Sequence, residues 1–145
     1  MPLDPDPLKD ILYRTTARYL AVRPAGLEIA GHLQTSLQGR VLAYGAARSL
    51  YRGKRPVCRS LDGLRSVHGE PCAACHEQPH CTPQARLDLL LDAIPHRLLL
   101  AYTSAKNFLL YVGALATRGL DVTRITTHME VVDRGTWGEV RFRQA

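Results

Sequence analysis

Apolar and polar residues alternate along several segments of the C-terminal half, a pattern that predicts half-buried β-strands. The alternating segments are 86–93, 96–102, 122–133 and 137–143. A short connection at 93–96 joins the first two segments, and Asp133-Arg134-Gly135 joins the last two. Short connections between alternating segments indicate hairpins. We therefore expect two hairpins in this half of the chain.

The residues between these hairpins follow the spacing of an amphipathic helix. Phe108, Tyr111, Val112 and Leu115 recur at i, i+3, i+4 and i+7. Thr103-Ser104 is expected to cap the start of the helix. Gly119 suits the left-handed residue that commonly ends a helix.

The N-terminal half is less regular. Residues 1–7 are rich in Pro and Asp and are expected to fray, and a short helix is predicted over about 8–20. The ranges 27–35 and 39–50 read as extended segments. The order of elements predicts one α+β, mainly β domain over 1–145: an OB-like five-stranded barrel with one helix before the closing hairpin. A four-stranded sheet with a helix on one face would give much the same pattern.

Four cysteines gather in a loop-like segment, 51–84, that we expect to be inserted in the barrel. Their spacing is Cys58-x13-Cys72-x2-Cys75-x5-Cys81. A Cys-x2-Cys pair offers two sulfurs to one tetrahedral ion, and two more ligands close a structural site. A loop of this length needs something to organise it. We expect one structural Zn²⁺ held by Cys58, Cys72, Cys75 and Cys81.

Other interpretations of the cysteines stay open. An iron–sulfur cluster also takes four cysteines, and the four could be unrelated free thiols. A histidine could replace one of the thiolates. The candidates are His68, His76 and His80.

Charge points towards an anionic partner. The formal net charge is +6, from 19 Lys and Arg against 13 Asp and Glu. The lysines are only Lys9, Lys54 and Lys106, and arginine grips phosphate bidentately and stacks on bases. A high GC content of the gene would explain the arginine bias equally well.

The run from residue 48 to residue 59 contains arginine and lysine residues interleaved with tyrosine, and it contains no aspartate or glutamate. Mixtures of this kind bind single-stranded nucleic acid, although a solvated basic face is the plainer interpretation. Tyr102, Phe108, Tyr111 and Trp137 are assigned to the core. The predicted nucleic-acid-binding residues are Arg48, Tyr51, Arg52, Lys54, Arg55 and Arg59, extended by Arg141 and Arg143 of the closing hairpin.

Several classes of protein lack support in the sequence. No Gly-x-Ser-x-Gly elbow, P-loop or Gly-x-Gly-x-x-Gly is present, so we expect no enzyme. No apolar run approaches the roughly 20 residues of a membrane span, and residues 1–7 lack the features of a signal peptide. We expect a cytoplasmic protein, where clustered cysteines favour metal over disulfides.

The segment from about Arg55 to Gly119 resembles small cysteine-cluster proteins of phages and integrative or conjugative elements. The resemblance rests on Cys58-Arg59-Ser60-Leu61-Asp62-Gly63, on Cys72-Ala73-Ala74-Cys75 with Cys81, and on 102–108 before the helix. It implies an OB-like, metal-stapled protein that binds single-stranded DNA in replication, recombination or a mobile element. The alternative is an accessory subunit whose metal loop docks on a larger nucleic-acid enzyme.

Overall fold

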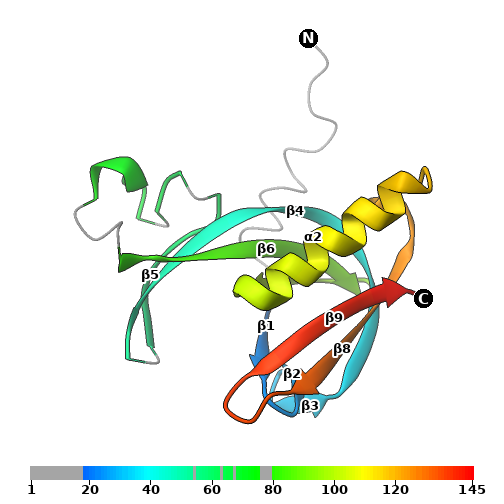
Figure 1. Ribbon diagram of the computed structural model, residues 1–145. Coiled ribbons are helices and arrows are strands. Elements are labelled where there is room, and N and C mark those ends of the chain that lie inside the picture. Colours follow the sequence, from blue (N-terminus) through cyan, green and yellow to red (C-terminus); the bar gives the residue numbers. More distant parts are fainter. Residues whose placement is uncertain (1–17, 54, 63, 67, 76–79) are drawn as a thin grey trace.

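The computed structural model describes residues 18–53, 55–62, 64–66, 68–75 and 80–145, and these residues form mainly β-structure with one α-helix (Figure 1). The strands are β1 (Arg18–Arg23), β2 (Gly26–Ile29), β3 (His32–Gln34), β4 (Ser36–Arg52), β5 (Arg55–Ser60), β6 (Thr82–Leu91), β7 (Ile94–Leu100), β8 (Thr126–Asp133) and β9 (Gly138–Gln144). The helix is α2 (Tyr102–Thr117), and the 3-10 turns are η1 (Cys72–Ala74) and η3 (Val122–Arg124). The mainly β class with one helix before a closing hairpin is therefore confirmed.

The long strand β4 organises the sheet. Its first residues pair with β8, its middle pairs with β6, and its last residues pair with β5. The strand order is β3-β2-β1-β7-β6-β4-β8-β9, with β5 pairing to β4 outside this path. The sheet has nine strands in the described residues and does not close on itself. A five-stranded OB-like barrel is thus not confirmed.

The prediction of a helix over 8–20 is wrong for residues 18–20, the part of it that the structure describes. Residues 18–20 belong to β1, which pairs in parallel with β7 and antiparallel with β2. Leu20 is buried in the core by this pairing, so tertiary contacts override the local helical spacing. The rest of that predicted helix, together with 1–7, lies outside the described residues.

The two predicted hairpins are confirmed, with small shifts in their boundaries. Strands β6 and β7 pair antiparallel: Ala85 lies opposite Leu100 at one end of the hairpin, and Leu91 lies opposite Ile94 next to the turn. Their turn is Asp92-Ala93, where both residues have positive φ, as a two-residue hairpin turn of type I′ requires. Strand β8 starts at Thr126 because Asp121 accepts a hydrogen bond from the N–H of Thr123 and sets up η3 first.

Helix α2 begins at Tyr102, two residues earlier than a cap at Thr103 would allow, so the predicted Thr103-Ser104 cap is wrong. Ala101 is the N-cap and makes no side-chain cap bond, whereas the hydroxyl of Ser104 accepts from the N–H of Val140. Ser104 therefore ties the helix to β9. At the other end Gly119 has φ +73° and donates to the carbonyl of Ala116, which confirms it as the terminating glycine.

One hydrophobic core lies between the sheet and α2. Its members include Leu27, Leu87, Leu98, Phe108 and Met129, all fully buried. The ring of Phe108 packs edge-on against Tyr44 and Phe142. The assignment of Phe108 and Tyr111 to the core is confirmed. The assignment of Tyr102 and Trp137 is wrong, because they are 79% and 44% exposed.

Candidate metal centre and basic surface

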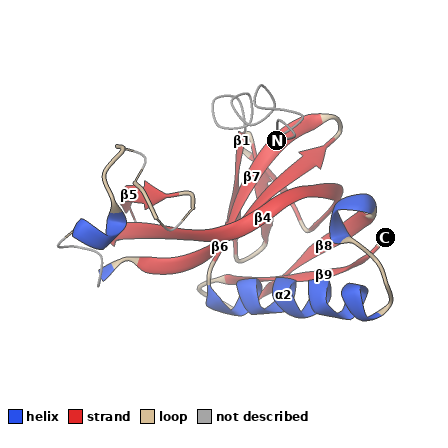
Figure 2. Cartoon of the chain, turned by 90° about the horizontal axis from the view of Figure 1, so that it is seen from above, coloured by secondary structure: helices blue, strands red, loops and turns tan. Residues whose placement is uncertain are grey.

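The segment expected to be a loop is partly a β-arm. Strand β5 pairs with the last residues of β4, and both strands extend away from the sheet that α2 covers (Figure 2). The register shifts between Leu50 and Tyr51, which marks a bulge in the arm. Sequence reading missed β5 because its composition, Arg55–Ser60, shows no clean alternation. The cysteines lie on this arm and on the loop that follows it.

All four cysteines line one hollow at the base of the loop. Cys58 comes from β5, Cys72 from η1, Cys75 follows η1, and Cys81 directly precedes β6. All four are free thiols; Cys72 is buried and Cys75 is exposed. The structure thus gathers four residues that span 24 positions of the sequence, as the metal hypothesis requires.

The thiols share the hollow without converging on a point. Among the described residues, no group of three or more His, Cys, Asp or Glu side chains is close enough to hold a metal ion. Burial raises the pKa of the Cys81 thiol, and the neighbouring Cys75 and Cys58 raise it further, while Arg48 opposes them. The donor chemistry suits a metal, but binding would require the thiols to draw together.

Hydrogen bonds already hold this loop in shape. The Oδ1 atom of Asp62 accepts from the N–H groups of Leu64 and Arg65 and from the hydroxyl of Ser60. These bonds lower the pKa of Asp62, the backbone bond from Arg65 contributing most. The N–H of Cys72 donates to the carbonyl of Leu64 at 2.8 Å, so η1 is tied to the loop that follows β5.

Two further possible ligands line the hollow: His68, which the sequence analysis named as a candidate, and Glu70, which it overlooked. His68-Gly69-Glu70 stands directly before Pro71-Cys72 in the chain, and both His68 and Glu70 line the hollow with the cysteines. The spacing His-x-Glu was the available signal. His80 is exposed and does not line the hollow, and His76 lies outside the described residues.

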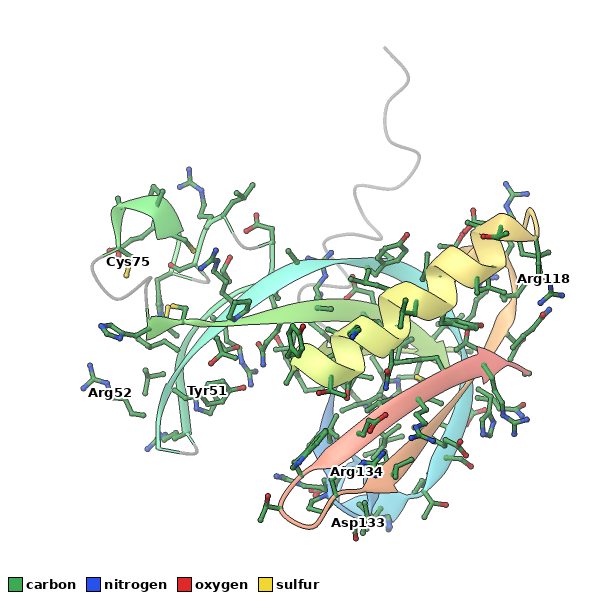
Figure 3. The ribbon with its side chains drawn as sticks, viewed as in Figure 1. Tyr51, Arg52, Cys75, Arg118, Asp133 and Arg134 are labelled. Atoms are coloured by element: carbon green, nitrogen blue, oxygen red, sulfur yellow. The ribbon has the colours of Figure 1, made fainter. Side chains whose placement is uncertain are left out.

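The predicted basic residues divide between the hollow and the tip of the arm. Arg48 and Arg59 line the hollow with the cysteines. Arg52 and Arg55 are exposed and face each other across the strand pair at the tip. Tyr51 is 37% exposed and accepts a hydrogen bond from Gln84. Figure 3 shows Tyr51 and Arg52 together on the arm. Lys54 lies outside the described residues.

Arg59 also contacts an aromatic ring that the sequence did not single out. Its guanidinium lies 5.1 Å from the ring centroid of Tyr19, and that of Arg97 lies 5.9 Å from the same ring. Arg97 is 4% exposed and its Nε lies 3.1 Å from Oδ1 of Asp88. Burial lowers the pKa of Arg97, but hydrogen bonds to Tyr19 and Asp88 outweigh burial and raise it overall.

This cluster had a sequence signal. Arg86 and Asp88 occupy the polar positions of β6, and Arg97 occupies a polar position of β7. In a hairpin, opposed residues share a face, and Asp88 lies directly opposite Arg97. Tyr19 had no such signal, because it enters the cluster through the parallel pairing of β1 with β7.

Arg141 and Arg143 lie apart from the basic run. Both belong to β9, which is separated from the arm by β8 and most of the length of β4 (Figure 1). Both are exposed, and Arg141 forms an ion pair with Glu139 at 3.1 Å. The structure therefore does not bring the seven predicted residues that it describes into one surface.

Comparison with known proteins adds no family. No protein-family model, curated protein or solved structure matches the chain, so the resemblance to mobile-element proteins stays a prediction. Within the described residues, no helix combines the length and the apolar character needed to cross a bilayer.

Proposed function

We propose that this protein is a non-enzymatic, zinc-stabilised domain that binds single-stranded DNA through its β-arm. One observation carries the proposal. The four cysteines line a hollow at the base of the same strand pair whose tip presents Tyr51, Arg52 and Arg55. A metal there would fix the position of β5, and β5 carries half of the tip.

Zinc is the metal that the donor set favours. Four thiolates fill a tetrahedral sphere and leave no position for activated water, so the role is structural. Cys58 would hold β5, and Cys72, Cys75 and Cys81 would hold the loop that returns to β6. Because such sites rarely form in the unfolded chain, their binding free energy becomes folding free energy. Arg48 and Arg59, in the same hollow, would offset the negative charge of the thiolates.

The tip has the chemistry that a single strand needs. Among the described residues, neither Arg52 nor Arg55 forms an ion pair with a carboxylate, in contrast to Arg23, Arg86 and Arg134. Unpaired guanidinium groups can contact phosphates without first losing a partner. The half-exposed ring of Tyr51 offers a stacking surface. The sheet is open, so the likeness to an OB fold is limited to the order of the strands, the helix and the closing hairpin. Only that order supports the proposal.

An enzymatic zinc site is the less favoured interpretation. Zinc deaminases combine His-x-Glu with Pro-Cys-x-x-Cys, where the glutamate moves protons. Both elements are present here, at 68–70 and 71–75, but no residue separates them, so they share one loop. Cys58 and Cys81 are also available to close the coordination sphere, which leaves no place for a reacting water.

Docking on a larger protein remains the second candidate, and exposed apolar side chains support it. Leu64 is 75% exposed on the cysteine loop, and Val57 is 41% exposed on β5. Apolar groups on a basic arm would suit contact with a nucleic-acid enzyme. In that case Leu64→Ser would abolish capture of the partner while leaving oligonucleotide affinity unchanged.

The test of the nucleic-acid proposal is a salt titration. The probe is a fluorescein-labelled dT20 oligonucleotide, measured at two salt concentrations by anisotropy. Real phosphate contacts make affinity fall steeply with salt, with a slope of about 0.7 per contact. Replacing Arg52 and Arg55 with alanine should weaken binding and reduce that slope. Replacing Arg40 and Arg124, two exposed arginines outside the arm, is the matched control. Equal behaviour of the two double variants, or no binding by the unmodified protein at low salt, would rule out the arm.

A further inference from the structure

A groove runs between α2 and β9, far from the arm. Apolar side chains line it, Leu110 and Tyr111 of the helix and Phe142 of the strand, and we call them its floor. The exposed side chains of Arg118, Arg141 and Arg143 also line it, and we call them its rim. Leu110 is 63% exposed. The groove extends along the C-terminal parts of both elements, which run side by side in Figures 1 and 2. Figure 3 marks its far end at Arg118.

The wall formed by β9 is an edge of the sheet that α2 covers at Val140 and that has no strand partner beyond it among the described residues. In the strand order β9 is terminal and pairs only with β8. The N–H of Val140 donates to Ser104, and its carbonyl accepts from Asn107, so the backbone polar groups of Val140 point away from β8. Alternate residues of a strand direct these groups the same way. Those of Phe142 and Gln144 therefore point into the groove, where they have no backbone partner among the described residues.

The rim of the groove carries excess positive charge. Three arginines face one carboxylate, Glu139, which lies 3.1 Å from Arg141 and 2.9 Å from Arg134. Arg118 and Arg143 form no ion pair with a carboxylate in the described part of the chain, although Arg118 lies 3.5 Å from the side-chain oxygen of Gln144. An occupant with carboxylates would complement this rim.

The aromatic rings of the floor are engaged with each other. Tyr111 stacks on Phe142 with centroids 6.2 Å apart, and both rings contact Phe108. Their faces are thus occupied, which disfavours a nucleobase as the ligand and leaves the aliphatic surface of Leu110 for apolar side chains. A second copy of this chain is disfavoured as well, because pairing two β9 edges would bring two arginine rims together.

We propose that the groove binds an extended acidic segment of a partner protein, which adds as a strand to β9. Its backbone pairs with Phe142 and Gln144, its apolar side chains lie on the floor against Leu110, and its carboxylates meet Arg118, Arg141 and Arg143. Strand addition of this kind takes affinity from main-chain bonds and specificity from alternate side chains. The proposal is independent of the function proposed for the arm.

The test uses two labelled hexapeptides, acetyl-(Asp-Val)3-amide and acetyl-(Lys-Val)3-amide, with the full-length protein. The acidic peptide should bind, and the basic peptide should bind at least about tenfold more weakly, since like charges oppose each other across an interface. Arg143→Glu should weaken the acidic peptide by roughly tenfold or more. Arg124→Glu, an equal charge change at an exposed residue outside the groove, should change its affinity less than about twofold.

A backbone variant tests the strand addition itself. Gln144→Pro removes an N–H that points into the groove rather than towards β8, so it should weaken the acidic peptide while circular dichroism and melting stay unchanged. Equal binding of both peptides, or no effect of Arg143→Glu, would overturn the proposal. Displacement of the peptide by dT20 would also overturn it, because the groove would then be a nucleic-acid site. So would a dimer, detected by sedimentation, that the peptide dissociates, because the groove would then bind a second copy of the chain. Arg52 and Arg55 variants should bind the acidic peptide normally, so failure here is distinct from failure of the arm.

Discussion

Asp88→Asn removes the carboxylate that compensates a buried arginine. Arg97 is 4% exposed, and its Nε lies 3.1 Å from Asp88. The same carboxylate lies 3.2 Å from Nε of Arg86, whose side chain is 19% exposed. At an effective dielectric constant of about 20, two unit charges at this separation attract by roughly 5 kcal/mol.

Removing one member of a buried pair typically costs about 3–5 kcal/mol, because the remaining charge is left without compensation. Tyr19 still bonds to Arg97, so we expect a loss of about 3 kcal/mol in the free energy of unfolding, measured by urea denaturation near neutral pH. Asp92→Asn changes the same charge in an exposed turn and should cost less than about 0.5 kcal/mol.

The double variant Asp88→Leu/Arg97→Met separates charge from packing. Replacing a buried pair by apolar residues of similar size is often neutral, so the double variant should be more stable than Asp88→Asn. If Asp88→Asn costs under about 1 kcal/mol, Asp88 does not compensate the buried charge of Arg97 and the reasoning from the buried pair fails.

Two further variants test the fold. Hydrogen bonds from Asn107, Arg134 and Arg141 lower the pKa of Glu139 to about 2. Its contribution to stability should therefore be complete above its ordinary pKa near 4.5 and be lost as the pH falls towards 2. Glu139→Gln should remove this part of the acid dependence in urea titrations at several pH values; an unchanged profile would contradict the assignment. Phe108→Ala should cost about 3–5 kcal/mol, because the ring is fully buried among three others, and a loss below about 1 kcal/mol would contradict the packing.

The elements that sequence predicted well are those whose partners are close in the chain. The β6–β7 and β8–β9 hairpins and the apolar face of α2 follow from local alternation and helical spacing, and Gly119 marks the end of the helix by its positive φ. The prediction of a helix at 18–20 was wrong because these residues form a strand that pairs with β7, more than 70 positions away. The prediction of a closed barrel was not confirmed, because no local pattern determines which strands lie at an edge of the sheet.

The candidate site shows the same division. The four cysteines were grouped by spacing alone, and the structure places them around one hollow. The two arginines of β9 were grouped with the basic run by charge, yet they lie on another surface. Tyr19 was missed because only the parallel pairing with β7 brings it near Arg59.

The metal content of the arm is the most direct test of the central claim. Freshly purified protein, never exposed to chelator, should contain about one zinc per chain and be colourless. Cys72→Ser should lose the metal and unfold at lower temperature, because metal binding contributes folding free energy. A brown protein with visible absorption would replace zinc by an iron–sulfur cluster. Protein without any metal, or a Cys72→Ser variant with unchanged zinc and melting, would contradict a metal-stapled arm.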